Sequence, residues 1–266
     1  MRIALGIEYD GAAFCGWQSQ PQGCAVQDAL EAALAAIAGE PVRVHVAGRT
    51  DRGVHATAQI AHFDTSATRP DSAWVRGVNA FVSNAIRVRW ASRVADSFHA
   101  RFTARARHYR YLLYNSPVAP AIGRDQLGWF HAPLELSPMR EAADYLLGEH
   151  DFSAFRAAEC QSRTPIKTLT RLTIERRSNI LIFDFSANAF LQHMVRNIVG
   201  ALVYVGCGRH EPAWIETLLE SRDRRLAAPT FGAAGLYLVG VDYPAEFALP
   251  KTSESTPQSL FAALEV

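Results

Sequence analysis

A chain of 266 residues with 49% hydrophobic and 20% charged side chains has the composition of a globular protein, with room for one large domain or two smaller ones. Its most apolar run, residues 198–205, is far shorter than the roughly 20 residues that a membrane-spanning helix needs. The first apolar run reaches Glu8 before a secretory signal could form, so we expect a cytoplasmic protein without a membrane partner.

The four cysteines, Cys15, Cys24, Cys160 and Cys207, are scattered along the chain. No two of them have the CxxC spacing that is typical of a structural zinc site, and four are too few for a disulfide scaffold. The sequence therefore predicts reduced thiols, most of them buried.

Positive charge is concentrated in one stretch, although the net charge is only +1. Residues 87–110 contain seven arginines, and the only acidic residue among them is Asp96. The planar guanidinium group fits phosphate oxygens, so this basic strip favours contact with a nucleic-acid backbone. An arginine-rich composition of the whole chain is the alternative explanation.

The first half of the chain is predicted to contain four strands and two helices. Residues 2–9 alternate in the manner of a strand, and apolar residues then recur at helical spacing until Gly39, a typical helix end. In chain order the elements are strand 2–9, helix 26–39, strands 42–47 and 57–64, helix 71–81 and strand 86–94. This is the βαββαβ order of a ferredoxin-like unit.

The second half repeats this order. Its predicted elements are strand 105–114, helix 138–147, strands 169–175 and 180–187, helices 190–205 and 212–219, and strand 235–242. The fold class is therefore α+β, with two tandem ferredoxin-like halves, residues 1–103 and 104–244, and a catalytic cleft between them. Residues 245–266 are rich in proline, serine, threonine and glutamate, which predicts a polar C-terminal tail.

The densest polar segment is residues 47–56, between two predicted strands. It is longer than a simple hairpin needs, and glycines bracket its charged residues. Asp51 is its only carboxylate, and the nearby Arg49 favours the ionised form, which can act as a nucleophile or general base. A solvated turn with an ordinary Arg–Asp pair is the alternative. Nearby histidines match no metal-ligand spacing, so we expect no metal.

The same segment carries a family resemblance. GRTDRGVHA, residues 48–56, closely resembles the signature of tRNA pseudouridine synthases of the TruA type. Further similar blocks extend over nearly the whole chain: ALGIEYDG (4–11), GWQ (16–18), FHARF (98–102), RHYRY (107–111), LLGEHDFSAFRA (146–157), CQSRTP (160–165), NAFLQHMVRNIVG (188–200) and GLYLVGVDYP (235–244). One departure is Arg52, where the family often carries a small residue; it adds charge beside Asp51 and removes no expected group.

The resemblance implies the pseudouridine synthase fold and an isomerase activity. Its expected reaction converts uridine to pseudouridine at positions 38, 39 and 40, in the anticodon stem-loop of tRNA, and needs no cofactor. The family parallel makes Asp51 the catalytic carboxylate, either as a nucleophile at C1′ or as a base for a sugar proton. It also implies a homodimer.

Three residues of the second half gain expected roles from the resemblance. Tyr109 matches a tyrosine that packs against the target base, and base stacking on an aromatic ring is worth roughly 1–3 kcal/mol. Arg196 matches an arginine that pairs with the catalytic aspartate; with Gln192, His193 and Asn197 it is predicted to form a polar patch facing the cleft. Leu236 matches an apolar residue of the base pocket. The alternative is a place in the strand core for Tyr109 and Leu236, and on the helix surface for Arg196.

Two other functions are compatible with the element order or the chemistry. A non-catalytic RNA-binding module of the RRM type has the same βαββαβ order, but its third strand carries an aromatic motif that residues 59–63 lack. A nucleoside or glycoside hydrolase also attacks C1′, but most glycosidases need a second carboxylic acid. Only Asp10 and Asp64 are available for that role, and neither lies in a comparable loop.

Overall fold

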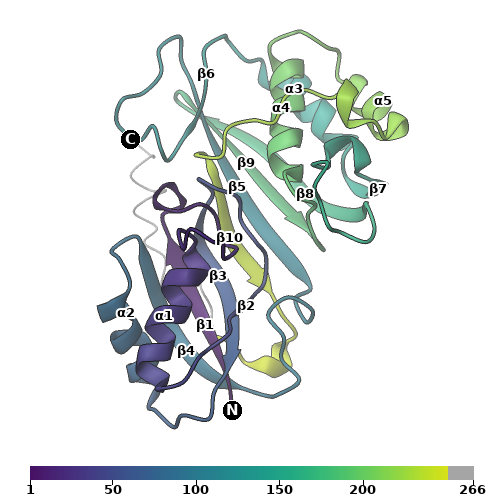
Figure 1. Ribbon diagram of the computed structural model, residues 1–266. Coiled ribbons are helices and arrows are strands. Elements are labelled where there is room, and N and C mark those ends of the chain that lie inside the picture. Colours follow the sequence, from purple (N-terminus) through teal and green to yellow (C-terminus); the bar gives the residue numbers. More distant parts are fainter. Residues whose placement is uncertain (251–266) are drawn as a thin grey trace. The chain divides into compact units, whose positions relative to one another are not determined.

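The computed structural model describes residues 1–250 and divides the chain into two compact units. Unit 1 contains residues 1–105 together with the chain from Tyr237, and unit 2 contains Ala106–Leu236 (Figure 1). Both units combine a sheet with helices, which confirms the predicted α+β class. Residues 251–266 of the predicted tail lie outside the described residues.

Unit 1 has the strand arrangement of a ferredoxin-like unit. Its elements are β1 (Arg2–Tyr9), α1 (Val26–Ala38), β2 (His45–Val46), β3 (His55–Asp64), the π-helical turn Ala73–Gly77 leading into α2 (Val78–Phe81), β4 (Ile86–Val94) and β10 (Leu236–Asp242), with short 3-10 turns at Gly11–Ala13 and Ala245–Phe247. β1 lies between β3 and β4 and is antiparallel to both, while β2 pairs with the other edge of β3. The predicted βαββαβ order gives this arrangement.

The last strand, β10, shares one edge of β3 with β2. β2 pairs near the end of β3, at His62, whereas Tyr237 of β10 pairs in parallel with His55 at its beginning. Most of β10 is therefore grouped with unit 1, although the sequence placed this strand at the end of the second half. Element order does not specify which strands pair, and the domain limits at residues 103 and 244 stay a prediction.

Both faces of the unit 1 sheet are covered. Strand alternation places Phe63 on one face, where its ring meets Trp74 edge-to-face at 5.2 Å. Figure 1 shows α1 lying over this sheet, and its buried residues include Leu30 and Leu34. On the opposite face Ile60 belongs to a buried cluster, against which Phe247 packs. Residues 243–249 are thus partly a core-covering segment, whereas the sequence predicted a polar tail from residue 245.

Unit 2 is an antiparallel sheet extended by one parallel strand. Its elements are β5 (Ala106–Asn115), β6 (Gly128–Phe130), α3 (Leu136–Asp144), β7 (Gly148–Asp151), β8 (Ile166–Arg177), β9 (Ile180–Ala187), α4 (Met194–Gly206) and α5 (Trp214–Ser221), with 3-10 turns at Ser153–Phe155 and Arg224–Leu226. β5, β9, β8 and β7 are neighbours in that order, and β6 pairs with β5. The predicted hairpin between β8 and β9 is confirmed, and Ser178 at its turn has a φ of 52°.

The helix predicted from Phe190 begins four residues later, at Met194. His193 has a left-handed φ of 63°, which a continuing helix does not allow. The Gln192 carbonyl accepts a hydrogen bond from Ala157 N–H at 3.0 Å, so the preceding residues are bound to another segment. The apolar pattern extended into this segment because Phe190 and Leu191 pack there without being helical.

The prediction of reduced thiols is wrong for two of the four cysteines. Cys15 and Cys24 form a disulfide, with their Cα atoms 5.5 Å apart, whereas Cys160 and Cys207 are free. The two residues are nine positions apart, and their approach depends on a chain reversal that includes Gly23, whose φ is 65°. A spacing of this length indicates nothing about pairing until the path of the chain between the cysteines is known.

Candidate active site

The predicted catalytic segment forms a loop, residues 47–54, between β2 and β3. Buried polar side chains hold its first half. The Gln59 side-chain amide donates to the Gly48 carbonyl at 2.8 Å and to the Tyr9 hydroxyl at 3.2 Å. The Tyr9 hydroxyl in turn lies 2.7 Å from Thr50 Oγ1. This chain of hydrogen bonds from two neighbouring strands fixes the backbone immediately before Asp51.

Burial determines the protonation state of this network. Gln59 is fully buried, and complete burial raises the pKa of Tyr9 to about 12. The Tyr9 hydroxyl therefore keeps its proton at neutral pH, and it can accept from Gln59 while sharing a hydrogen bond with Thr50. Each of the three side chains has a partner in this network, which restricts its movement, although the buried Gln59 Oε1 accepts no hydrogen bond within the described part of the chain.

A second segment, around Gly16, holds the loop from its other side. Trp17 N–H donates to the Thr50 carbonyl at 3.0 Å. Gly16 has a φ of 103°, and a Cβ atom at this position would lie 3.0 Å from the Thr50 carbonyl oxygen and 3.1 Å from the Arg52 nitrogen. Only glycine permits both this backbone conformation and this close approach.

The loop ends in a tight turn that begins at Asp51. Val54 N–H donates to the Asp51 carbonyl at 3.1 Å, and Gly53 has a φ of 78°. Gly11 packs against this turn so closely that a Cβ atom there would lie 2.0 Å from the Val54 carbonyl oxygen. The next residue, His55, is buried and stacks on the Tyr237 ring at 4.7 Å, so the turn leads directly into the pairing of β3 with β10.

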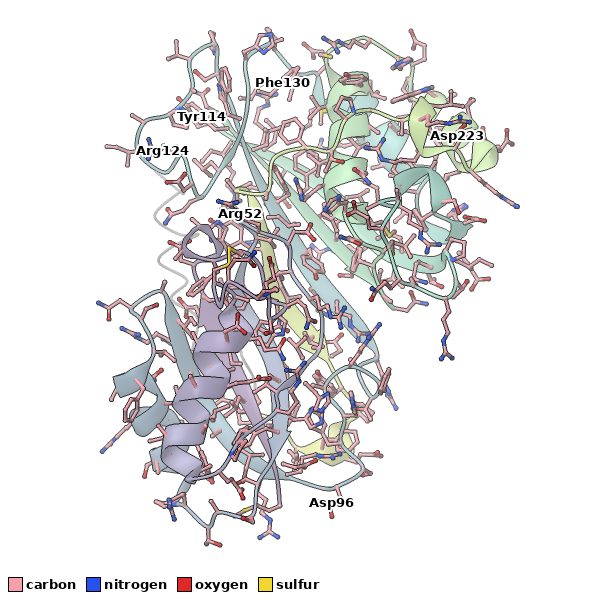
Figure 2. All side chains as sticks on the ribbon, in the orientation of Figure 1. Arg52, Asp96, Tyr114, Arg124, Phe130 and Asp223 are labelled. Carbon is pink, nitrogen blue, oxygen red and sulfur yellow. A yellow bond between two sulfur atoms is a disulfide. The ribbon has the colours of Figure 1, made fainter. Side chains whose placement is uncertain are left out.

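Exposure increases outward from this network. Thr50 is buried, Asp51 is half-buried, and Arg49 and Arg52 are exposed (Arg52 is labelled in Figure 2). Asp51 is thus a carboxylate at the boundary between the core and solvent, on a backbone held in one conformation and flanked by two guanidinium groups along the chain. This arrangement can present an anionic oxygen to a substrate.

Tyr109, Arg196 and Leu236 all belong to unit 2. Tyr109 is a nearly buried residue of β5, and Phe190 meets its ring edge-to-face at 5.0 Å. Arg196, in the first turn of α4, is half-buried and donates from Nε to the Phe231 carbonyl at 2.8 Å, while Phe231 N–H donates to the Arg196 carbonyl. Leu236 is buried at the first position of β10.

The predicted polar patch around Arg196 is wrong for Asn197. This side chain is fully buried, donates to the Phe155 carbonyl at 2.7 Å, and accepts from the Thr230 hydroxyl at 2.7 Å. Arg224 also donates to it, at 3.1 Å. Adjacent residues of a helix point about 100° apart, so Asn197 faces the interior of the unit while Arg196 lies nearer its surface.

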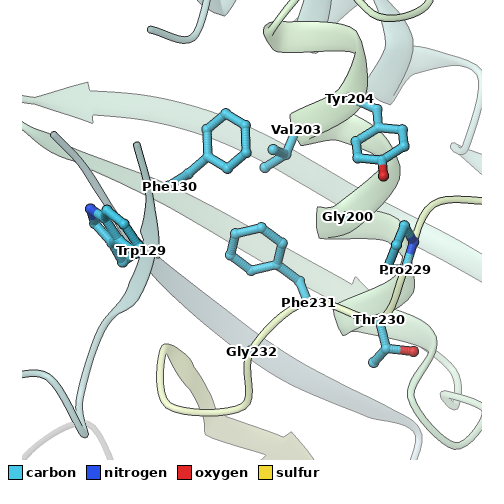
Figure 3. A pocket seen from close by; sticks show the side chains of 9 residues that line it. All are labelled: Trp129, Phe130, Gly200, Val203, Tyr204, Pro229, Thr230, Phe231 and Gly232. Carbon is cyan, nitrogen blue, oxygen red and sulfur yellow. The ribbon is translucent and has the colours of Figure 1, made fainter. Parts of the chain in front are cut away.

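A cavity of about 260 Å³ in unit 2 was not predicted. Four of its nine lining residues are aromatic, and Figure 3 shows the full set: Trp129, Phe130, Gly200, Val203, Tyr204, Pro229, Thr230, Phe231 and Gly232. Phe231 belongs both to this wall and to the segment bonded to Arg196. The lining residues carry no carboxylate, imidazole or amine, so the cavity offers shape and apolar surface rather than acid–base chemistry.

The basic strip of residues 87–110 is only partly available for phosphate contacts. Arg110 binds both carboxylate oxygens of Asp184, at 2.8 and 3.0 Å, and Arg107 is buried and donates to the Asn188 carbonyl. The other residues lie in unit 1, where Arg89, Arg93, Arg101 and Arg105 are exposed. The sequence window contained one acid, but the partner of Arg110 comes from the neighbouring strand β9.

Residues 1–250 contain no group of three histidine, cysteine or acidic side chains arranged to hold a metal ion. No helix in this part of the chain has the length and apolar character to span a bilayer.

The residues that hold the loop of residues 47–54 in place were not predicted to be functional; they are Tyr9, Gln59, Gly16 and Trp17. Tyr9 follows Ile3, Leu5 and Ile7 on one face of β1, and this alternation could have indicated a buried hydroxyl that needs a partner. Gln59, in the middle of a buried strand, carries the same signal. Gly16 and Trp17 could be recognised only as part of the GWQ motif, which indicates no contact.

Comparison of the sequence with known proteins finds matches to one family. A family model described as tRNA pseudouridine synthase matches residues 6–103 and 142–244. A protein of Methylobacillus flagellatus named tRNA pseudouridine synthase A is 59% identical over 252 residues, covering 95% of this chain and 97% of that protein. Its namesake from Thiobacillus denitrificans is 57% identical over 257 residues, covering 97% and 99%.

Similarity to solved structures is more distant. A structure titled as an H/ACA RNP bound to a substrate RNA containing 2'-deoxyuridine matches with a TM-score of 0.36 and 11% identity. The match covers 85% of this chain and 59% of that one.

Proposed function

This chain belongs to the tRNA pseudouridine synthase family, and we propose that it isomerises uridine to pseudouridine in tRNA with Asp51 as its catalytic carboxylate. The observation that carries this assignment is the fixed conformation of the loop of residues 47–54. Tyr9 and Gln59 fix its backbone at Thr50, and the next residue, Asp51, lies at the boundary with solvent. A carboxylate positioned before substrate arrives loses little entropy in the reaction.

The reaction breaks the N1–C1′ bond, turns the uracil, and joins C5 to C1′. C5 loses a proton and N1 gains one, so no atom or electron is exchanged with a second substrate. Asp51 acts in its ionised form, either by attacking C1′ or by removing a sugar proton.

Unit 2 supplies the other proposed contacts. Tyr109, whose ring meets that of Phe190 edge-to-face, is the aromatic residue against which the detached uracil turns without a fixed orientation. Arg196 pairs with Asp51; a guanidinium carries five N–H donors, so its bond from Nε to Phe231 is compatible with a carboxylate pair through the terminal nitrogens. Leu236, which directly precedes Tyr237 in the chain, contributes apolar surface to the base pocket.

The proposed substrate site is the anticodon stem-loop, at positions 38, 39 and 40. Drawing a uridine out of a stacked stem costs a few kcal/mol, and contacts from the exposed arginines of unit 1 to phosphates offset that cost. We further propose that the protein acts as a homodimer in the cytoplasm and needs no cofactor. Light scattering of the purified protein, alone and with tRNA, tests the dimer.

The decisive experiment replaces Asp51. Asp51→Asn and Asp51→Ala should lower pseudouridine formation on unmodified tRNA at least about 10³-fold, while tRNA affinity stays within about threefold. Asp96→Asn is the matched control, because this exposed carboxylate of unit 1 lies in a turn outside the loop; its activity should equal that of the unchanged protein.

The same assay separates the other functions. Substantial activity in Asp51→Asn would remove Asp51 from its proposed role. Release of free uracil by the unchanged protein would indicate a hydrolase, and binding without any product would indicate an RNA-binding module. Mapping of pseudouridine along the tRNA tests positions 38, 39 and 40 individually.

A further inference from the structure

The disulfide between Cys15 and Cys24 closes a short loop, residues 15–24, which we call the disulfide loop. A backbone hydrogen bond runs beside the cross-link, from Cys15 N–H to the Cys24 carbonyl at 2.9 Å. The Gln20 side chain also donates to the Cys15 carbonyl, at 3.0 Å. The ends of the loop are therefore joined covalently and by hydrogen bonds, while its tip at residues 20–23 is exposed.

The disulfide loop connects the start of α1 with the loop of residues 47–54, which we call the Asp51 loop. Val26 N–H donates to the Gly16 carbonyl and Gln27 N–H to the Trp17 carbonyl, both at 3.1 Å. On the other side of the same residue, Trp17 N–H donates to the Thr50 carbonyl at 3.0 Å. Trp17 is thus bound through both of its backbone groups, and its buried ring lies 5.9 Å from that of Tyr9.

Gly16 packs closely against the backbone of the Asp51 loop, so a displacement of Gly16 is transmitted to that loop. The position of a Cβ atom on Gly16 would be only 3.0–3.2 Å from backbone atoms of Thr50, Asp51 and Arg52. Because these contacts are between backbones, no side-chain rotation can absorb a shift of Gly16. A displacement at Cys15 must therefore move the backbone that carries Asp51 or break the hydrogen bond between Trp17 and Thr50.

We propose that the Cys15–Cys24 disulfide is a positioning element for Asp51, so that turnover depends on the thiol–disulfide state of this pair. This inference rests on the proposed role of Asp51. In the forward step, the two thiols give two electrons and two protons to a disulfide oxidant such as oxidised glutathione, which leaves as two thiols. A dithiol reductant reverses the step.

The placement of the pair allows this exchange. Cys15 and Cys24 are both half-buried, beside the exposed tip of the loop, so a small disulfide or dithiol can reach them. Without the cross-link, residues 15–24 regain conformational freedom, and Gly16 and Trp17 are held only by hydrogen bonds and packing. The two other cysteines, Cys160 and Cys207, lie in unit 2 and serve as internal references.

The test compares oxidised and reduced protein. Thiol titration should show two free thiols after treatment with oxidised glutathione and four after dithiothreitol. Reduction should lower kcat about tenfold and leave KM for tRNA within about twofold, because the Asp51 carboxylate is displaced while the RNA-binding surface is kept. Hydrogen exchange should accelerate in peptides covering residues 14–20 and 47–54, and not in β9. Reoxidation should restore kcat.

Two variants complete the test. Cys15→Ser/Cys24→Ser should have the low kcat of the reduced protein and be insensitive to dithiothreitol, whereas Cys160→Ser/Cys207→Ser should respond like the unchanged protein. If the first variant fails to fold, the redox titration of the unchanged protein still decides. An equal kcat in the two redox states, or four free thiols after oxidation, would overturn the proposal. Failure of the Asp51 assignment is distinguishable, because Asp51→Asn would then be active.

Discussion

In unit 1 the proposed catalytic residue lies on a loop that buried polar groups hold in place, whereas in unit 2 its proposed partner lies on a helix held mainly by apolar packing. Thr50 is fixed by the Tyr9 hydroxyl and by Trp17 N–H. Arg196 belongs to α4, in which eleven of thirteen residues are buried, including Met194 and Ile198. The backbone that carries each residue is thus held in place, but through different interactions.

This difference determines how each region responds to substitution. Removal of one partner from a buried hydrogen bond leaves the other unsatisfied and costs about 1–3 kcal/mol, and the loss is concentrated at one place. Packing of α4 is spread over many side chains, so the helix keeps its place when one contact is trimmed. We therefore expect single-atom changes to alter activity through the Asp51 loop and mainly stability through unit 2.

The largest effect is expected for Gly11→Ala. The new Cβ atom would lie 2.0 Å from the Val54 carbonyl oxygen, which is backbone and cannot rotate away. The turn at Asp51 must move, so kcat should fall at least about 100-fold in the pseudouridine assay. Gly77→Ala is the control, because its Cβ would meet only the flexible Ile37 side chain, at 2.7 Å. Equal kcat values for the two variants would contradict the close packing at Gly11.

Loss of the cross-link should have the next largest effect, on stability. Opening a loop of roughly ten residues lowers the free energy of unfolding by about 2–3 kcal/mol through the entropy of the unfolded chain. Urea denaturation of Cys15→Ser/Cys24→Ser, read by hydrogen exchange in β1, should show this decrease in unit 1. Amides of β9 in unit 2 should be unchanged, and an equal decrease there would mean that the disulfide stabilises both units.

A matched pair of tyrosines sharpens the comparison. The Tyr9 hydroxyl contacts Thr50 and Gln59, whereas the Tyr111 hydroxyl donates to the Gly232 carbonyl, at 2.8 Å. Tyr9→Phe should cost about 2 kcal/mol and lower kcat, and Tyr111→Phe should cost about 1 kcal/mol with a smaller effect on kcat. Thermal unfolding and steady-state kinetics measure both. A larger loss of kcat in Tyr111→Phe would reverse the assignment.

The fold could be predicted from local pattern to a large extent. Alternation over residues 2–9 and helical spacing up to Gly39 gave elements whose limits agree with β1 and α1 within one residue. The helix start at Phe190 failed because apolar residues continued past the αL residue His193, and periodicity does not report φ. Likewise, the order of strands along the chain did not show that β10 pairs with β3.

The site was predictable only where its residues are neighbours in sequence. Asp51 could be selected because glycines frame a charged loop, but Tyr9 and Gln59 lie 41 and 9 positions from Thr50, and nothing local connects them to it. The same limit applies to Arg110, whose partner Asp184 is 74 positions away, and to the disulfide. Contacts across strands depend on register, which a single sequence specifies weakly.

The predicted effect that is smallest near neutral pH is a pH dependence of the stability of unit 1. Among residues 1–250, both buried histidines, His55 and His62, belong to this unit. Burial lowers the pKa of His62 to about 3, helped by the positive charges of His99, Arg2 and His45, while Asp64 raises it. The Nδ1 atom of His62 accepts from Ala100 N–H at 3.2 Å, so the folded unit favours the neutral ring.

The sign of this dependence follows from proton binding. In the unfolded chain histidine titrates near 6.5, so between about pH 6.5 and 3 the unfolded state binds more protons than the folded state. The stability of unit 1 should therefore decrease as the pH falls through this range, by at most about 1.4 kcal/mol per pH unit from His62. His62→Asn, which keeps an acceptor for Ala100 N–H, should flatten the decrease between pH 7 and 5 measured by hydrogen exchange in β1. His150→Asn in unit 2 should not flatten this decrease. An unchanged slope of stability against pH in His62→Asn would mean that another group titrates.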